Sequence, residues 1–219
     1  MSRYLVGIDT GGTYTDTVIL DSRNHAVVAS AKALTTHGDL SLGVSSSLST
    51  ALDSASHVAP KQIHHVSLST TLATNALVEG RGSSVAVLLI GFDDAMRART
   101  NIASAVPAAQ LISIAGGHRY DGHEQEPLDE AAIREACQNV AADAYAVASH
   151  YAVRNPLHER RAASLIREIT GKPVSASCDL SDSLNGPLRA LTAAFNARII
   201  SLIVNLNDAV TESLRRLGI

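Results

Sequence analysis

The chain has 219 residues, a formal net charge of −3 and 3% aromatic residues, with no tryptophan. This length has room for one large domain or two small ones. Nucleic-acid recognition depends on clustered Lys and Arg, and no basic cluster stands out, so we expect no nucleic-acid partner. No apolar run approaches the roughly 20 residues of a membrane helix, so we expect no membrane span. Cys137 and Cys178 stand far apart, which favours reduced thiols in a cytoplasmic protein.

The N-terminal segment predicts three antiparallel strands. Residues 4–9 and 14–21 are two β-prone runs, and the Gly-Gly turn between them is typical of a β-hairpin. Turn-forming residues follow at 21–24, and residues 25–34 predict the third strand.

Helices and strands then alternate. Asp39 is a suitable N-cap for a helix that ends before Pro60, and residues 63–68 predict a strand. A helix over 72–79 and a buried strand over 84–90 complete the order βββ-α-β-α-β. We expect a phosphate-binding lobe over residues 1–92.

The turn between the first two strands carries the candidate chemistry. Glycines allow backbone N–H groups to approach phosphate oxygens, and a carboxylate at a strand end can hold Mg²⁺. The alternative is that Gly11-Gly12 is merely a hairpin turn. More polar groups surround this turn than a hairpin needs: Asp9, Thr10, Thr13, Thr15 and Asp16.

Three motifs carry a family resemblance. The string GIDTGGTYTDTVILD (residues 7–21) resembles the phosphate motif of the actin, Hsp70 and sugar-kinase superfamily, and in detail the DxGGTFTD string of the hydantoinase A/5-oxoprolinase family. Residues 69–79 are similar to that family's GTTxATNAxxE segment, and residues 155–161 to its NPxHER segment. The chain departs at Leu68-Ser69, where the family usually has His-Gly.

The resemblance implies an α/β, actin-like (ribonuclease H-like) nucleotide lobe that binds ATP and Mg²⁺. Asp9 would hold Mg²⁺ through water, and Asp9 and Asp16 are the candidate catalytic residues; Asp16 would either orient the hairpin or act nearby. The remaining residues implied to bind the cofactor are Thr10, Gly11, Gly12, Thr13, Thr15, Thr70 and Thr71.

The middle of the chain predicts a small α/β subdomain over residues 93–180. We expect an irregular crossing over 93–127, then helix, strand, helix and strand up to residue 177. His118, His123, Glu124 and Glu126 fit no zinc spacing and are interpreted as solvated loop residues. His158 and Glu159 are interpreted as first-turn charges of the helix that begins after Asn155-Pro156.

An apolar stripe predicts a long helix over residues 188–217. By the resemblance, residues 181–219 would be a connecting helix toward a second nucleotide lobe that this chain lacks. The chain alone would then turn over ATP weakly or not at all.

Three functions remain open. The resemblance implies ATP-driven opening of a cyclic amide, or carboxylation of a ketone by a related subunit, with a companion hydantoinase B-type subunit. One alternative is a small-molecule kinase of the same superfamily. The other is a non-catalytic interaction module whose last helix forms a homodimer or binds another subunit.

Overall fold

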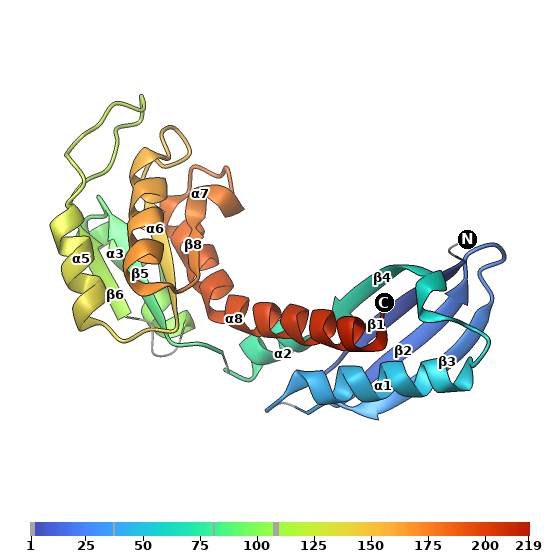
Figure 1. The fold of residues 1–219 in the computed structure, drawn as a ribbon. Helices are drawn as coiled ribbons and strands as arrows, with labels where there is room; N and C mark the ends of the chain where they lie inside the picture. Colours follow the sequence, from blue (N-terminus) through green and yellow to red (C-terminus); the bar gives the residue numbers. More distant parts are fainter. Residues whose placement is uncertain (1–2, 37, 81, 107–109) are drawn as a thin grey trace. The chain divides into compact units, whose positions relative to one another are not determined.

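The computed structural model describes residues 3–36, 38–80, 82–106 and 110–219. The chain divides into two compact units (Figure 1). Unit 1 comprises Met1–Val78 with Leu202–Ile219, and unit 2 comprises Glu79–Ser201.

Unit 1 is built on a four-stranded sheet in the order β3-β2-β1-β4. The strands are β1 (Tyr4–Thr10), β2 (Tyr14–Asp21), β3 (Val27–Leu34) and β4 (Ile63–Thr70), the last preceded by the 3₁₀ turn η1 (Pro60–Gln62). The first three are antiparallel as predicted, and β4 is parallel to β1. The β1–β2 register sets Asp9 opposite Asp16, which brings the two predicted carboxylates together.

One face of this sheet carries the core of unit 1. Tyr4, Val6 and Ile8 alternate inward along β1 and pack with Val44 and Leu48 of helix α1 (Leu40–Ser54). The side chain of Asp39 caps α1 as predicted. Gly43 allows α1 to approach the hairpin, because a β-carbon there would lie 2.8 Å from the Leu34 carbonyl oxygen. A short helix, α2 (Leu72–Val78), follows β4.

Unit 2 contains a parallel sheet in the order β6-β5-β7-β8. Its strands are β5 (Val85–Ile90), β6 (Gln110–Ile114), β7 (Ala144–Ser149) and β8 (Val174–Ala176). Its helices are α3 (Asp94–Arg99), α4 (Ile102–Ala105), α5 (Glu130–Asn139), α6 (Leu157–Thr170), α7 (Ser177–Leu180) and the first part of α8 (Gly186–Leu217). Residues on both faces of β5 and β7 are buried, as a parallel sheet covered on two sides requires.

Two expectations are corrected here. Strand β5 pairs with β6 and β7, so it belongs to unit 2, and the boundary falls after residue 78 rather than after residue 92. The segment 93–127, expected to be irregular, contains α3, α4 and β6. Residues 107–109 of that segment lie outside the described residues.

Helix α8 contributes to both cores. Ala190, Ala193 and Ala197 are buried in unit 2, whereas Leu206 and Val210 are buried in unit 1. Contrary to the expectation from apolar run lengths, α8 is long and apolar enough to cross a membrane by length and composition, and within the described residues no other helix is. A core helix of a water-soluble protein satisfies the same criteria.

Two residues of the NPxHER segment, His158 and Glu159, are buried in unit 2. Glu159 is an acidic residue of the first turn of α6, as predicted, but it is fully buried, and His158 is 7% exposed. Glu159 accepts hydrogen bonds from Ser149 N, Ser177 Oγ and Cys178 N, which tie the first turn of α6 to the ends of β7 and β8.

Candidate functional site

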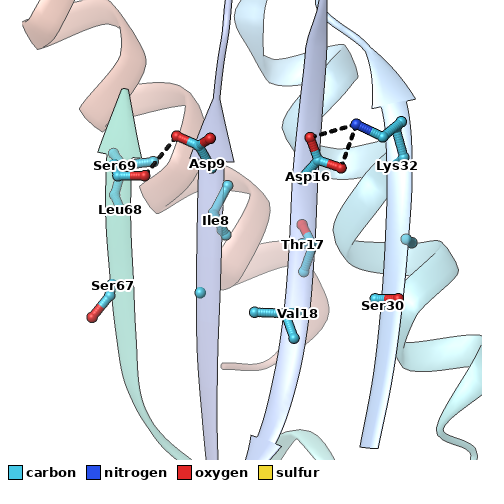
Figure 2. A pocket seen from close by; sticks show the side chains of 12 residues that line it. Ile8, Asp9, Asp16, Thr17, Val18, Ser30, Lys32, Ser67, Leu68 and Ser69 are labelled. Atoms are coloured by element: carbon cyan, nitrogen blue, oxygen red, sulfur yellow. Dashed lines mark hydrogen bonds and ion pairs between the residues drawn. The ribbon is translucent and has the colours of Figure 1, made fainter. Parts of the chain in front are cut away.

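The sheet face of unit 1 opposite α1 holds an open hollow of about 600 Å³ (Figure 2). The hollow is lined by Gly7, Asp9, Asp16 and Lys32, among others. Because successive side chains of a strand point to opposite faces of the sheet, these residues lie on the face that does not carry the core. The hollow therefore combines two carboxylates and one ammonium on rigid strands.

Each carboxylate has its own partner. The Ser69 hydroxyl of β4 donates to Asp9 Oδ1 at 2.6 Å, and Lys32 Nζ of β3 lies 2.7 Å from the Asp16 carboxylate (Figure 2). The Lys32 ammonium also lies 4.8 Å from the centroid of the Tyr14 ring. Asp9 is exposed, and its second oxygen has no protein partner among the described residues.

The Gly-Gly turn lies beside Asp9 at the end of the hairpin. Gly11 N donates to Tyr14 O at 2.9 Å, which closes the turn. A β-carbon on Gly12 would lie 3.1 Å from Asn75 Nδ2 of α2, so a glycine lets the turn pack closely against this helix. Thr13 is exposed at the tip.

Thr10 and Thr15 point to the other face of the sheet. Both are fully buried: Thr15 Oγ1 lies 3.0 Å from Thr35 Oγ1, and Thr10 Oγ1 has no hydrogen-bond partner among the described residues. The expectation that these two side chains bind the cofactor is corrected by this burial, because alternation places them on the α1 side. Only their backbone groups lie along the hairpin.

Thr70 and Thr71 begin the α2 segment. The Thr70 hydroxyl donates to Thr10 O at 2.7 Å and accepts from Leu72 N, so it joins β1 to the start of α2. Thr71 is exposed, and its Oγ1 would lie 3.9 Å from a β-carbon on Gly11. Thr71 therefore lies next to the glycine turn, whereas the Thr70 hydroxyl is already occupied.

The donor set fits a magnesium-bound nucleotide better than a metal ion held by protein alone. Within the described ranges, no group of three or more His, Cys, Asp or Glu side chains is placed to hold a metal ion. Mg²⁺ is usually held by one or two carboxylates together with water and substrate phosphates. Asp9, with one oxygen unoccupied beside the glycine turn, is suited to that arrangement.

Sequence reasoning missed three residues of this site: Lys32, Ser69 and Asn75. Lys32 lies in an ordinary alternating strand, and its pairing with Asp16 follows only from the β2–β3 register. Ser69 departs from the family pattern, which usually has glycine there, and this departure is the sequence signal that could have pointed to a role for its hydroxyl.

The β1–β2 hairpin, the parallel β4 and the carboxylates beside a glycine turn define an actin-like nucleotide lobe of an α/β protein. The sequence model of the hydantoinase/oxoprolinase N-terminal region matches residues 5–170, and the chain belongs to this family.

Two curated relatives are enzyme subunits. The chain is 33% identical to caprolactamase subunit alpha of Pseudomonas jessenii over 75% of this chain and 26% of the relative. It is 30% identical to the acetophenone carboxylase gamma subunit of Aromatoleum aromaticum over 97% of this chain and 33% of the relative. The chain thus spans about a quarter to a third of these relatives.

Solved structures support the same fold. An ATP-dependent acetone carboxylase in its nucleotide-free form matches with a TM-score of 0.79 at 20% identity, over 100% of this chain and 35% of that chain. The ATP-dependent caprolactamase of Pseudomonas jessenii matches with a TM-score of 0.73 at 27% identity, over 96% of this chain and 34% of that chain. The predicted fold class is confirmed.

Proposed function

We propose that the chain is the N-terminal nucleotide-binding part of an ATP-dependent enzyme that opens a cyclic amide or carboxylates a ketone. The observation that carries the proposal is the pairing of Asp9 and Asp16 beside the Gly11-Gly12 turn. The names of the relatives, an ATP-dependent caprolactamase and two ketone carboxylases, support this range of substrates.

The roles of the residues follow from their surroundings. When bound, ATP with Mg²⁺ supplies a phosphoryl group that converts an unreactive carbonyl oxygen into a leaving group. Asp9 would hold the ion through water, with Ser69 fixing the orientation of the carboxylate. The backbone N–H groups of Gly12 and Thr13 would bind phosphate oxygens, and Lys32 would balance their charge.

We also propose how active the chain is by itself and which subunit it binds. Because the chain spans at most about a third of its relatives, we expect it to turn over ATP weakly by itself. A companion hydantoinase B-type subunit is the expected partner, because the relatives are themselves named as subunits.

A titration of the full chain with ATP and Mg²⁺, followed by ¹H–¹⁵N NMR, tests the nucleotide site. We expect Mg²⁺-dependent shifts of the Gly11, Gly12 and Thr13 amides at millimolar nucleotide, and their loss in Asp9→Asn. Asp53→Asn, which changes an exposed carboxylate of α1, is the matched control and should bind as the wild type does. Equal binding by Asp9→Asn would refute the assignment of Asp9.

Product analysis of the assembled enzyme separates two chemistries. An amide-opening enzyme releases inorganic phosphate with the opened product, whereas a kinase leaves phosphate on its product.

A docking role for α8 is a second candidate. Ile203 and Val204, in the part of this helix that belongs to unit 1, are 37% and 46% exposed, so they offer apolar surface to a second copy or another subunit. Sedimentation of the chain as a monomer at all concentrations would argue against the homodimer.

A further inference from the structure

Unit 2 has a second hollow that the nucleotide site does not use. It measures about 480 Å³ and is lined by side chains from the segment after β6 and from the beginning of α6. His118 and His158 lie against each other there, with ring centroids 4.2 Å apart. The ends of parallel strands are where ligands bind in open α/β sheets, and this volume is within the range of small-molecule sites.

The proton positions of His158 follow from its contacts. Gly117 N donates to His158 Nδ1 at 2.9 Å, so Nδ1 is an acceptor and the ring proton lies on Nε2. His158 Nε2 then donates to Glu124 Oε1 at 2.8 Å. This chain of bonds fixes one oxygen of Glu124 and leaves the other directed to solvent, with 56% of the side chain exposed.

Most hydrogen-bond donors around the hollow are already engaged. Arg161 donates to both oxygens of Glu130, at 2.6 and 2.9 Å, and Asn155 Nδ2 donates to Gly122 O at 3.0 Å. These donors are therefore not available to a ligand. The groups of the hollow that are still free to form hydrogen bonds are acceptors.

His118 supplies the second acceptor. The residue is 3% exposed, and its Nδ1 has no hydrogen-bond partner among the described residues. Burial, and secondarily the neighbouring His158, lower the pKa of His118, which favours the neutral ring with one acceptor nitrogen. His118 lines the hollow, and because its Nδ1 is fully buried, Nε2 is the ring nitrogen that a ligand there can reach.

We propose that this hollow binds a small primary amine: Glu124 would pair with the ammonium group, His118 Nε2 would accept a hydrogen bond from one of its N–H groups, and Leu128 and Leu157 would contact a short aliphatic chain. An anion is disfavoured by the carboxylate of Glu124, because Arg161 is already paired with Glu130 and leaves the hollow with a net negative charge. A metal ion is disfavoured because the described residues provide no three-ligand group here.

Titration of the full chain with n-butylammonium, followed by NMR of the His118 ring, tests this proposal. We expect saturable shifts with n-butylammonium and none with n-butanol, which lacks the charge, or with tetramethylammonium, which lacks N–H donors. Absence of saturation, or equal binding of n-butanol or tetramethylammonium, would overturn the proposal.

Glu124→Gln is the informative variant, because its carbonyl oxygen can still accept from His158. Loss of the charge should weaken n-butylammonium binding about tenfold. Glu126→Gln, two residues along the same exposed loop, is the control and should bind unchanged. Equal affinity of Glu124→Gln and wild type would contradict the proposed ion pair. Asp9→Asn should bind n-butylammonium normally, which separates this site from the nucleotide site.

Discussion

Replacing Glu159 by Gln tests whether the buried carboxylate of the NPxHER segment stabilises unit 2. Glu159 accepts hydrogen bonds of 2.5 Å from Ser149 N, 2.7 Å from Ser177 Oγ and 2.8 Å from Cys178 N. Ser177 Oγ also accepts from Arg189 Nε at 3.3 Å, and Arg189 is 1% exposed. A buried carboxylate and a buried guanidinium are thus joined through one hydroxyl.

The expected loss can be worked from these contacts. In Glu159→Gln, the carbonyl oxygen can still accept from Ser149 and Ser177, but the amide NH₂ faces the Cys178 N–H, so one charged hydrogen bond of about 1.5–3 kcal/mol is lost. Arg189 also loses part of its charge compensation, but it touches Glu159 only through Ser177 and keeps its carbonyl acceptors, so the cost of about 3–5 kcal/mol that is typical of breaking a direct buried pair is an upper bound. We expect a loss of stability of about 2–4 kcal/mol.

Hydrogen exchange measured by mass spectrometry gives the local stability of unit 2. Peptides that cover β7 and β8 should lose protection in Glu159→Gln, whereas peptides of unit 1 serve as an internal reference. Glu168→Gln, on the exposed side of the same helix, is the matched control and should change stability by less than about 0.5 kcal/mol.

A double-mutant cycle completes the test. In a background of Arg189→Met, Glu159→Gln should cost less than it does alone, because no buried cation remains to compensate. Protection of β7 and β8 within about 0.5 kcal/mol of wild type in the single variant would refute the reasoning.

Three further predictions concern single residues. Gly43→Ala should lower the unfolding free energy of unit 1 in urea by about 1–3 kcal/mol, because its β-carbon meets the Leu34 carbonyl; a more stable variant would contradict this. Ser69→Ala should weaken Mg²⁺–nucleotide binding about three- to tenfold without changing stability, and unchanged affinity would exclude a positioning role. Burial lowers the pKa of His118 below 6.5, so the unfolded chain binds more protons at low pH; unit 2 should lose stability, seen as a falling urea midpoint, as pH drops below about 6.5.

Much of unit 1 could be predicted from the sequence because its signals are local. Strand β2 has the predicted bounds, residues 14–21, since alternation and the Gly-Gly turn both lie within one hairpin. The pairing of Asp9 with Asp16 follows from the same turn. Strand alternation also predicts that the Thr10 side chain points to the face of the sheet opposite to that of Asp9. The family motif includes Thr10 with the residues of the glycine turn, and this led to its assignment as a cofactor-binding residue.

The rest depended on contacts between distant residues. The apolar run of β5 indicates burial on both faces but does not determine which sheet the strand joins, and its partners β6 and β7 come later in the chain. The burial of His118 depends on His158, 40 residues onward, and the Ser69–Asp9 hydrogen bond spans 60 residues. No local pattern encodes such pairs, which is why these side chains were misassigned or missed.

The division of α8 between two cores has a consequence for the order of folding during synthesis. Unit 2 is one continuous stretch, residues 79–201, whereas unit 1 needs Leu206 and Val210 from the last turns of α8. The ribosome therefore releases every residue of unit 2 before unit 1 can complete its core. The strands that carry Asp9 are synthesised first, but their core stays incomplete until Leu206 and Val210 have been synthesised.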